Sequence, residues 1–206
     1  MKSNIKYILI GIVVLILIIV IFFLSQKLSK SNDQENMELL TGKYNVLIDV
    51  KDYGKITLEL DADKAPITVT NFINLVNDKF YDGITFHRII NGFMIQGGDP
   101  TGTGYSGSGK TIKGEFSDNG VENDISHVRG VISMARSGNS YDSASSQFFI
   151  VHKDSTFLDG KYAAFGYVTD GMDVVDKIAE SVETEDDNGT VSRENQPVIN
   201  SIRVIK

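Results

Sequence analysis

The sequence predicts a mainly β protein, a closed antiparallel barrel capped by two helices and preceded by one apolar N-terminal segment. Three features of the chain lead to this prediction. About seven or eight short stretches after residue 43 alternate apolar and polar residues or are rich in β-branched and aromatic residues, as strands are. Two other stretches place apolar residues at helical spacing. Glycine-rich and Asn-Gly connections between them are typical of the tight turns of antiparallel sheets.

The N-terminal segment Tyr7–Leu24 predicts a membrane-spanning helix. Its 18 residues contain no charge and no proline, and it lies between Lys2 and Lys6 on one side and Lys27 and Lys30 on the other. At about 1.5 Å per residue such a helix measures about 27 Å, close to the roughly 30 Å hydrocarbon core of a bilayer. A cleaved signal peptide and a buried core helix are the alternatives, although no Ala-x-Ala cleavage site follows the segment.

The chain therefore divides into four predicted parts. These are a short cytoplasmic segment (1–6), a transmembrane anchor or signal sequence (7–24), a polar linker (25–42) and a folded domain (43–206). The positive charges that flank the apolar segment slightly favour an N-terminus inside the cell. We therefore expect a single-pass protein of the cell membrane whose folded domain lies outside the cytoplasm, or a secreted domain if the segment is cleaved.

Composition excludes several classes of function. The chain has no cysteine, so it has neither disulfides nor thiolate metal sites. Residues 43–206 contain 16 Lys and Arg against 24 Asp and Glu, and this acidic balance argues against nucleic acid as a partner. The histidines His87, His127 and His152 lack metal-ligand spacing, and no G-x-S-x-G motif is present. The fragment Asp186-x-Asn188-Gly189 resembles part of a calcium loop that lacks the first and twelfth carboxylates. We expect neither a metal nor a cofactor.

The first half of the domain predicts two hairpins and a helix. The stretches Tyr44–Val50 and Gly54–Leu60 alternate in polarity and form the first hairpin. A helix begins at Pro66, because proline is favoured in the first turn. Its apolar stripe consists of Ile67, Val69, Phe72, Ile73, Leu75 and Val76. The second hairpin lies within Phe86–Asp99 and turns at Asn91-Gly92, a strong hairpin signal.

A glycine-rich loop follows the second hairpin and contains a misleading motif. Residues 104–111 match the phosphate-loop pattern G-x-x-x-x-G-K-[ST]. That pattern binds phosphate only where a strand enters it and a helix leaves it. Two glycines within the ten residues after Lys110 exclude such a helix, so nucleotide binding is not expected.

The second half of the domain predicts strands around one further helix. The strands are Val128–Ala135, Ser146–His152, Tyr162–Val168 and Val198–Ile205, and the helix is Gly171–Ser181. An acidic loop, Glu183–Glu194, connects this helix to the last strand.

The hairpin within Phe86–Asp99 carries the first candidate site. Its turn places Arg88 and Gln96 on either side, with Phe93 and Met94 close to the turn. A cation, an amide and two apolar side chains on one patch suit an extended peptide with a hydrophobic side chain. The alternative is that Phe93 and Met94, like Phe149 and Phe157, are ordinary core residues.

Over Tyr44–Lys206 the sequence resembles the cyclophilins, which are peptidyl-prolyl cis-trans isomerases. The motifs are long: Phe86-His-Arg-Ile-Ile-x-Gly-Phe-Met-Ile-Gln-Gly-Gly-Asp99, Gly130-Val-Ile-Ser-Met-Ala135, Ser145-Ser-Gln-Phe-Phe-Ile150 and Phe157-Leu-Asp-Gly160. The resemblance implies an eight-stranded antiparallel barrel with two helices. It also implies rotation about Xaa-Pro bonds of proline-containing polypeptides, including exported proteins, without a cofactor. A proline-binding chaperone with little turnover, and a surface scaffold that uses Glu183–Glu194, are the alternative functions.

The resemblance also assigns roles to residues. It makes Arg88 the catalytic arginine. The proline pocket would be formed by Phe93, Met94, Phe149 and Leu158, and the peptide groove by Gln96, Ala135, Arg136 and Gln147.

Three positions of the site differ from the animal-type pattern and match replacements common in bacterial-type members. Phe157 stands where many members have Trp, Tyr162 where they have His, and Arg136 where they have Asn. Because Phe lacks the indole N–H donor, we expect cyclosporin binding to be possible but weak.

Overall fold

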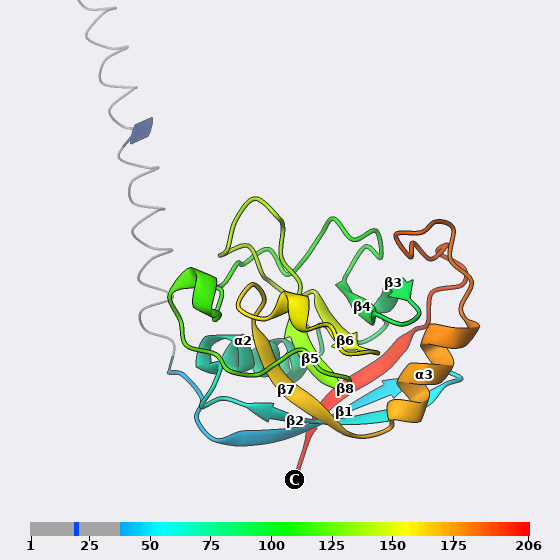
Figure 1. Ribbon diagram of the computed structural model, residues 1–206, viewed down its shortest axis with the longest axis horizontal. Helices are drawn as coiled ribbons and strands as arrows, with labels where there is room; N and C mark the ends of the chain where they lie inside the picture. The colour runs from blue at the N-terminus through cyan, green and yellow to red at the C-terminus, as the bar shows by residue number, and fades with distance from the viewer. Residues whose placement is uncertain (1–18, 21–37) are drawn as a thin grey trace, which may run out of the picture. The chain divides into compact units, whose positions relative to one another are not determined.

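The computed structural model describes residues 19–20 and 38–206, of which Leu39–Lys206 form one compact unit. Its strands are β1 (Lys43–Val50), β2 (Gly54–Asp61), β3 (Thr85–Ile90), β4 (Met94–Asp99), β5 (Val131–Met134), β6 (Phe148–Val151), β7 (Ala164–Asp170) and β8 (Ile199–Ile205). Its helices are α2 (Pro66–Asn77) and α3 (Met172–Ser181), with single 3₁₀ turns η1 (Ser117–Asn119) and η2 (Thr156–Leu158). The mainly β fold with two helices is confirmed. Figure 1 shows α2 and α3 lying apart, with α3 at the right of the view.

All eight strands belong to one antiparallel sheet in the order β3-β4-β6-β5-β7-β2-β1-β8. The edge strand β3 and the chain just before β8 meet at a short isolated bridge between Thr85 and Val198. Two hydrogen bonds flank it, from Phe86 N to the Pro197 carbonyl (3.0 Å) and from Ile199 N to the Ile84 carbonyl (2.8 Å). The closed barrel expected from the sequence is therefore a half-barrel, because no continuous ladder joins its two edges.

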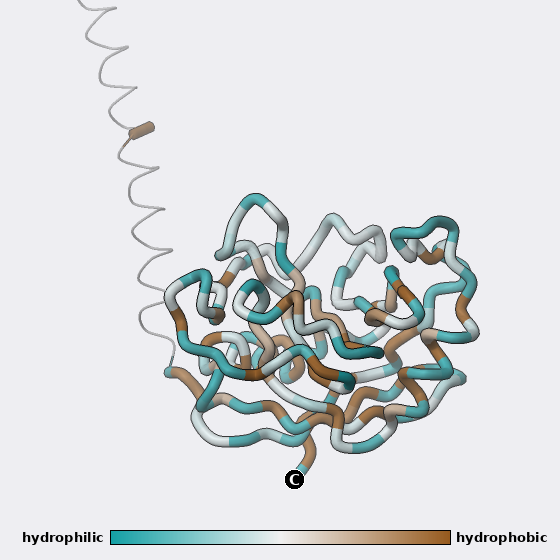
Figure 2. The backbone as a smooth tube through the Cα atoms, viewed as in Figure 1, coloured by the Kyte–Doolittle hydropathy of each residue, from teal (hydrophilic) through white to brown (hydrophobic). Residues whose placement is uncertain are grey.

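The interior of the sheet is filled by alternate residues of the strands. On β1 and β2 the inward residues Val46, Ile48, Ile56 and Leu58 are fully buried, while their sequence neighbours are more exposed. This period of two is the pattern from which the strands were predicted. Figure 2 shows hydrophobic residues concentrated on the strands and helices, with the long loops mostly hydrophilic or neutral.

Helix α2 begins at Pro66, as predicted, and buries Val69, Phe72 and Val76 against this interior. The first-turn N–H groups of a helix have no partner within it. Here the buried carboxylate of Glu115 accepts two of them, from Ile67 (3.0 Å) and Thr68 (2.8 Å). No local sequence pattern indicates this cap, because Glu115 lies 48 positions beyond Ile67.

A second hydrophobic cluster lies on the other face of the sheet. On β6, Phe148 and Ile150 belong to the interior, whereas Phe149 and Val151 belong to the second cluster. Because successive side chains of a strand point to opposite faces, β4 likewise gives Met94 to the second cluster and Ile95 to the interior. This outer cluster positions the apolar part of the candidate site.

Several predicted boundaries differ from the structure. The strand predicted over Val128–Ala135 is only Val131–Met134, and Gly171 precedes α3 rather than beginning it. Residues 104–111 contain no helix, and the chain continues into a single bridge between Ile112 and Ala144. No helix follows the glycine-rich motif, so it lacks the context of a phosphate loop.

The membrane segment predicted at 7–24 lies outside the described residues, apart from positions 19 and 20. Among residues 19–20 and 38–206, the helices are too short or too polar to cross a bilayer.

Candidate active site

The hairpin of β3 and β4 places Arg88 directly opposite Gln96. Ile90 pairs with Met94, so three residues form the connection, and Gly92 has the left-handed backbone (φ 78°) that glycine adopts at no steric cost. The expected turn at Asn91-Gly92 is present. Phe93 lies in it rather than on a strand, which lets its ring reach out of the sheet.

Three hydrogen bonds hold the guanidinium of Arg88. Nη1 donates to Gln96 Oε1 (3.2 Å), Nε donates to the Asn188 carbonyl (2.8 Å), and Nη2 donates to Asn188 Oδ1 (3.1 Å). Burial lowers the pKa of Arg88, and the nearby Tyr162 and Asp186 raise it. An arginine remains a cation throughout the working pH range. The result is a fixed, half-buried positive charge.

Asn188 belongs to the acidic loop, which the sequence did not connect with the hairpin. The loop follows the free edge of β3: Ile89 N donates to the Gly189 carbonyl (2.8 Å) and Val191 N donates to the His87 carbonyl (3.1 Å). Gly189 has a left-handed backbone, and a side chain there would collide with the carbonyl of Ile89. The Asp186-x-Asn188-Gly189 turn, which in the sequence resembles a calcium-loop fragment, is the signal that marks this loop, and in the structure it supports Arg88.

The side-chain amides of Gln96 and Gln147 continue the network across the sheet. Gln96 Nε2 donates to Gln147 Oε1 (2.9 Å), and Gln147 Nε2 donates to the carbonyls of Gly104 (2.9 Å) and Ser106 (2.7 Å). Both amides are therefore fixed in orientation, and they join the hairpin to the glycine-rich loop.

The structure brings ten of the eleven predicted site residues around one hollow of about 430 Å³. Its lining residues are Arg88, Phe93, Met94, Gln96, Ala135, Arg136, Phe149, Phe157, Leu158, Tyr162 and Asn188. Only Gln147 lies elsewhere, and Asn188 is the addition that sequence reasoning missed.

The apolar side chains of this hollow, which we call the apolar hollow, form a floor and a rim. Met94, Phe149 and Leu158 are buried and form the floor, and the ring of Tyr162 meets that of Phe149 edge-on at 5.9 Å. Phe157 is 62% exposed and its ring lies 5.6 Å from that of Phe93, so it belongs to the rim. The alternative that all these residues are ordinary core is wrong for Phe157.

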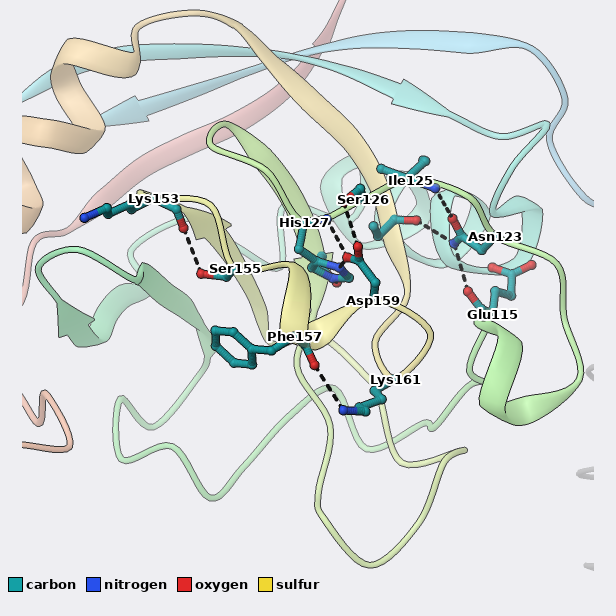
Figure 3. A network of polar contacts seen from close by, with 12 residues as sticks. Glu115, Asn123, Ile125, Ser126, His127, Lys153, Ser155, Phe157, Asp159 and Lys161 are labelled. Carbon is teal, nitrogen blue, oxygen red and sulfur yellow. Dashed lines mark hydrogen bonds and ion pairs between the residues drawn. The ribbon is translucent and has the colours of Figure 1, made fainter.

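A polar network centred on the exposed carboxylate of Asp159 and the buried ring of His127 supports this floor (Figure 3). The carboxylate of Asp159 accepts hydrogen bonds from Ser126 Oγ (2.6 Å) and from His127 N (2.7 Å), and it contacts His127 Nδ1 at 2.9 Å. The His127 ring stacks on Phe149 with 6.0 Å between centroids. Asp159 directly follows η2, so the network fixes both Phe149 and the turn that carries Leu158.

The same network resembles a hydrolase triad in outline, because His127 Nε2 lies 3.0 Å from Ser133 Oγ. Ser133 is 0% and His127 1% exposed, so no substrate can reach the hydroxyl. Burial lowers the pKa of His127, and Asp159 only partly opposes this. The arrangement is structural, which agrees with the absence of a serine-hydrolase motif.

A second hollow of about 420 Å³ adjoins the first, and we call it the polar hollow because glycines and Ser, Thr, Gln and Arg residues make up most of its lining. It shares Gln96, Ala135 and Arg136 with the apolar hollow. The rest of its lining is Gly104, Tyr105, Ser106, Gly107, Gly109, Thr111, Ser137, Ser143, Ser145 and Gln147. Together the two hollows form a groove with one apolar and one polar compartment.

The groove sets one held cation, Arg88, beside apolar side chains. Among the described residues no group of three acidic or histidine side chains could hold a metal ion. What the groove offers is a fixed cation beside an apolar compartment large enough for a small ring.

Comparisons with known proteins agree with this geometry. The sequence model of the family described as cyclophilin type peptidyl-prolyl cis-trans isomerase/CLD matches residues 45–204. The chain belongs to the cyclophilin family. Its activity is accordingly peptidyl-prolyl cis-trans isomerisation.

Individual relatives of this cyclophilin are similar over most of their length. Peptidyl-prolyl cis-trans isomerase B of Bacillus subtilis is 48% identical over 60% of this chain and 82% of its own. Peptidyl-prolyl cis-trans isomerase A of Dickeya dadantii is 46% identical over 74% of this chain and 80% of its own. A cyclophilin-type isomerase of Cryptosporidium parvum, solved in the presence of the dipeptide Ala-Pro, superposes with a TM-score of 0.69 at 30% identity, covering 79% of this chain and 99% of its own.

Proposed function

We propose that this cyclophilin isomerises Xaa-Pro bonds by donating a hydrogen bond from Arg88 to the proline nitrogen in the twisted transition state. The observation that carries the proposal is the guanidinium itself, which three hydrogen bonds hold at the edge of the apolar hollow. With Nε and one N–H of each terminal nitrogen engaged, the remaining N–H groups are available to a substrate.

The chemistry of the reaction explains why a fixed cation is effective. Rotation about an Xaa-Pro bond has a barrier of about 18–20 kcal/mol because the planar amide is stabilised by resonance. In the twisted state the proline nitrogen regains its lone pair and becomes a hydrogen-bond acceptor. A donor that meets the nitrogen only then stabilises the transition state more than either planar isomer. Arginine suits this role because its planar group stays protonated.

The remaining residues of the groove would hold the substrate on either side of the rotating bond. Met94, Phe149 and Leu158 form an apolar floor for the proline ring, bordered by Phe93 and Tyr162. The fixed amides of Gln96 and Gln147, with the backbone of Ala135, lie beside the second compartment, where the adjoining peptide would bind.

The test measures exchange between the cis and trans forms of a proline peptide by NMR, with the domain 39–206. Arg88→Ala should lower kcat/KM about 100-fold or more, the usual cost of losing a preorganised donor. Arg88→Lys keeps the positive charge but loses the planar guanidinium. Its activity should also fall, because an ammonium group cannot keep all three hydrogen bonds of the guanidinium. Unchanged kcat/KM in both variants would exclude the mechanism.

A proline-binding chaperone with little turnover is the alternative function. It predicts suppression of aggregation that survives Arg88→Ala, together with a negligible exchange rate in the wild type. The scaffold hypothesis for Glu183–Glu194 is tested by pull-down with and without this loop, whose contacts within the domain include β3, Arg88 and the carbonyl of Thr101.

We further propose that cyclosporin binds weakly. Phe157 stands on the rim of the apolar hollow without the N–H donor that an indole supplies at this place. Titration of the wild type and of Phe157→Trp with cyclosporin tests this, and the variant should bind more tightly. Equal affinities would contradict the reasoning.

For location, we propose a bacterial-type cyclophilin anchored in the cell membrane through 7–24, with its domain outside the cytoplasm acting on exported proteins. The support is the uncharged run of 18 residues, its flanking lysines and the similarity to bacterial relatives. Secretion after cleavage is the alternative. Membrane fractionation with mass spectrometry of the mature N-terminus distinguishes the two, since an intact segment in the membrane fraction supports the anchor.

A further inference from the structure

We infer that Arg136 makes this cyclophilin selective for substrates with an acidic side chain two residues from the proline. The inference rests on the proposed function, because it assumes that the proline ring occupies the apolar hollow. It adds the chemistry of the neighbouring residue, which the polar hollow would receive.

The charge of the groove is the first observation. The domain is strongly acidic, with 24 Asp and Glu against 16 Lys and Arg in 43–206. None of these carboxylates lines either hollow, while two cations do: Arg88 in the apolar hollow and Arg136 in both. A groove that excludes every acid of an acidic domain is complementary to an anion.

The second observation is how Arg136 is held. Its guanidinium carbon lies 4.8 Å from the ring centre of Tyr162, 5.0 Å from that of Tyr141 and 5.4 Å from that of Phe116. Contacts of this kind are attractive between a cation and an aromatic face. They keep the positive charge at the boundary of the two hollows instead of leaving it to move in solvent.

The hydrogen bonds of Arg136 leave part of the group for a ligand. Nε donates to the Lys161 carbonyl (2.8 Å) and Nη1 to the Ser137 carbonyl (3.0 Å). No residue in the described part of the chain accepts a hydrogen bond from Nη2. A carboxylate is the strongest acceptor for such a donor in proteins.

The position of the acidic residue follows from the shape of an extended peptide. Alternate side chains of an extended chain point the same way, about 6–7 Å apart along it. A proline ring in the apolar hollow therefore points to the same side as the residue two positions away. The two hollows are adjacent and share Arg136, so that second side chain would enter the polar one beside the guanidinium.

The test compares three acetylated proline peptides that carry Glu, Gln or Lys two residues before the proline, and a second set with the change two residues after it. NMR exchange gives kcat/KM without a coupling protease. In one of the two sets the kcat/KM of the wild type should be higher for Glu than for Gln, and higher for Gln than for Lys. Each step should be about two- to fivefold, which is the range expected for a partly exposed ion pair. Salt at 0.5 M should reduce the ratio.

Substitutions then assign the preference to one side chain. Arg136→Gln should remove the preference and Arg136→Lys should keep most of it. The quantity compared is the ratio of kcat/KM values for two peptides measured on the same variant. A general loss of activity from disturbed ring packing lowers both values equally and leaves this ratio unchanged. Lys51→Gln, which removes the same charge from the β1–β2 turn and lines neither hollow, is the matched control and should leave the ratio unchanged.

Equal kcat/KM for Glu, Gln and Lys peptides in both sets of the wild type, or a preference that survives in Arg136→Gln, would overturn the inference. The proposed function is judged separately, from the acceleration of the neutral Gln peptide. Acceleration of that peptide without any charge preference would leave the isomerase mechanism standing and remove the role of Arg136.

Discussion

Asn188→Ala tests whether the acidic loop orients Arg88, the arginine that we propose to be catalytic. The substitution removes the Oδ1 atom that accepts from Arg88 Nη2 at 3.1 Å, but it keeps the backbone carbonyl that accepts from Nε at 2.8 Å. It also keeps the hydrogen bonds that dock the loop on β3. The guanidinium should therefore stay in place but rotate more freely about the Nε contact.

The expected magnitude follows from that single lost contact. A hydrogen bond to a charged group contributes about 1.5–3 kcal/mol when buried, and an exposed ion pair about 0.2–1 kcal/mol. Because Asn188 is exposed and Arg88 half-buried, about 0.5–1.5 kcal/mol is expected, or a two- to tenfold fall in kcat/KM. The fall should be in kcat rather than KM, since the donor is needed most in the twisted transition state.

Asp187→Ala is the matched control. Asp187 is the neighbouring exposed residue of the same loop and makes no hydrogen bond within the described part of the chain, so its kcat/KM should change less than twofold. In an Arg88→Lys background, Asn188→Ala should have little further effect, because the paired donor is already gone. A folded Asn188→Ala variant with wild-type kcat/KM would refute the positioning role.

Two further predictions concern stability. Asp159→Asn should lower the free energy of unfolding by about 1–3 kcal/mol in urea, because it weakens the contacts to Ser126 and His127, and should also raise KM by loosening the floor of the apolar hollow. Ser126→Ala removes one contact and should cost less; an equal or larger cost would contradict this account. Burial raises the pKa of Asp99, but hydrogen bonds from Thr101 and Ser106 outweigh it and lower the pKa from 3.8 to about 2. Because the folded-state pKa is depressed, this stabilisation of about 2 kcal/mol is complete above about pH 5 and is lost as the pH falls towards 2. Asp99→Asn should abolish that part of the pH dependence in urea titrations.

Much of the fold and site could be predicted because the information is local in sequence. The period-two alternation of β1 and β2 predicts which side chains face the interior, since the geometry of a strand fixes that relation between neighbours. The Asn-Gly pair likewise predicts the hairpin, although the connection of three residues, Asn91 to Phe93, is what sets Arg88 opposite Gln96 rather than Ile95. The long motifs that resemble the cyclophilins then add Phe149, Leu158 and Tyr162, which no periodicity would have joined to the hairpin.

The tertiary structure decided the contacts between segments that are distant in sequence, because these contacts depend on strand register and on the path of the loops. Asn188 reaches Arg88 across 100 positions, Glu115 caps α2 across 48, and Asp159 holds His127 across 32. None of these pairs leaves a periodic trace, because each is a single polar contact.

The sequence by itself determined the family, the strands and the identity of most groove residues. Only the folded chain decided that the half-barrel closes at one short bridge and that the acidic loop completes the arginine's hydrogen bonds. The same holds for Arg136, which lines both hollows. The physical reason is that backbone preferences act between neighbours, whereas a binding groove is made where segments far apart in the chain come to rest against each other.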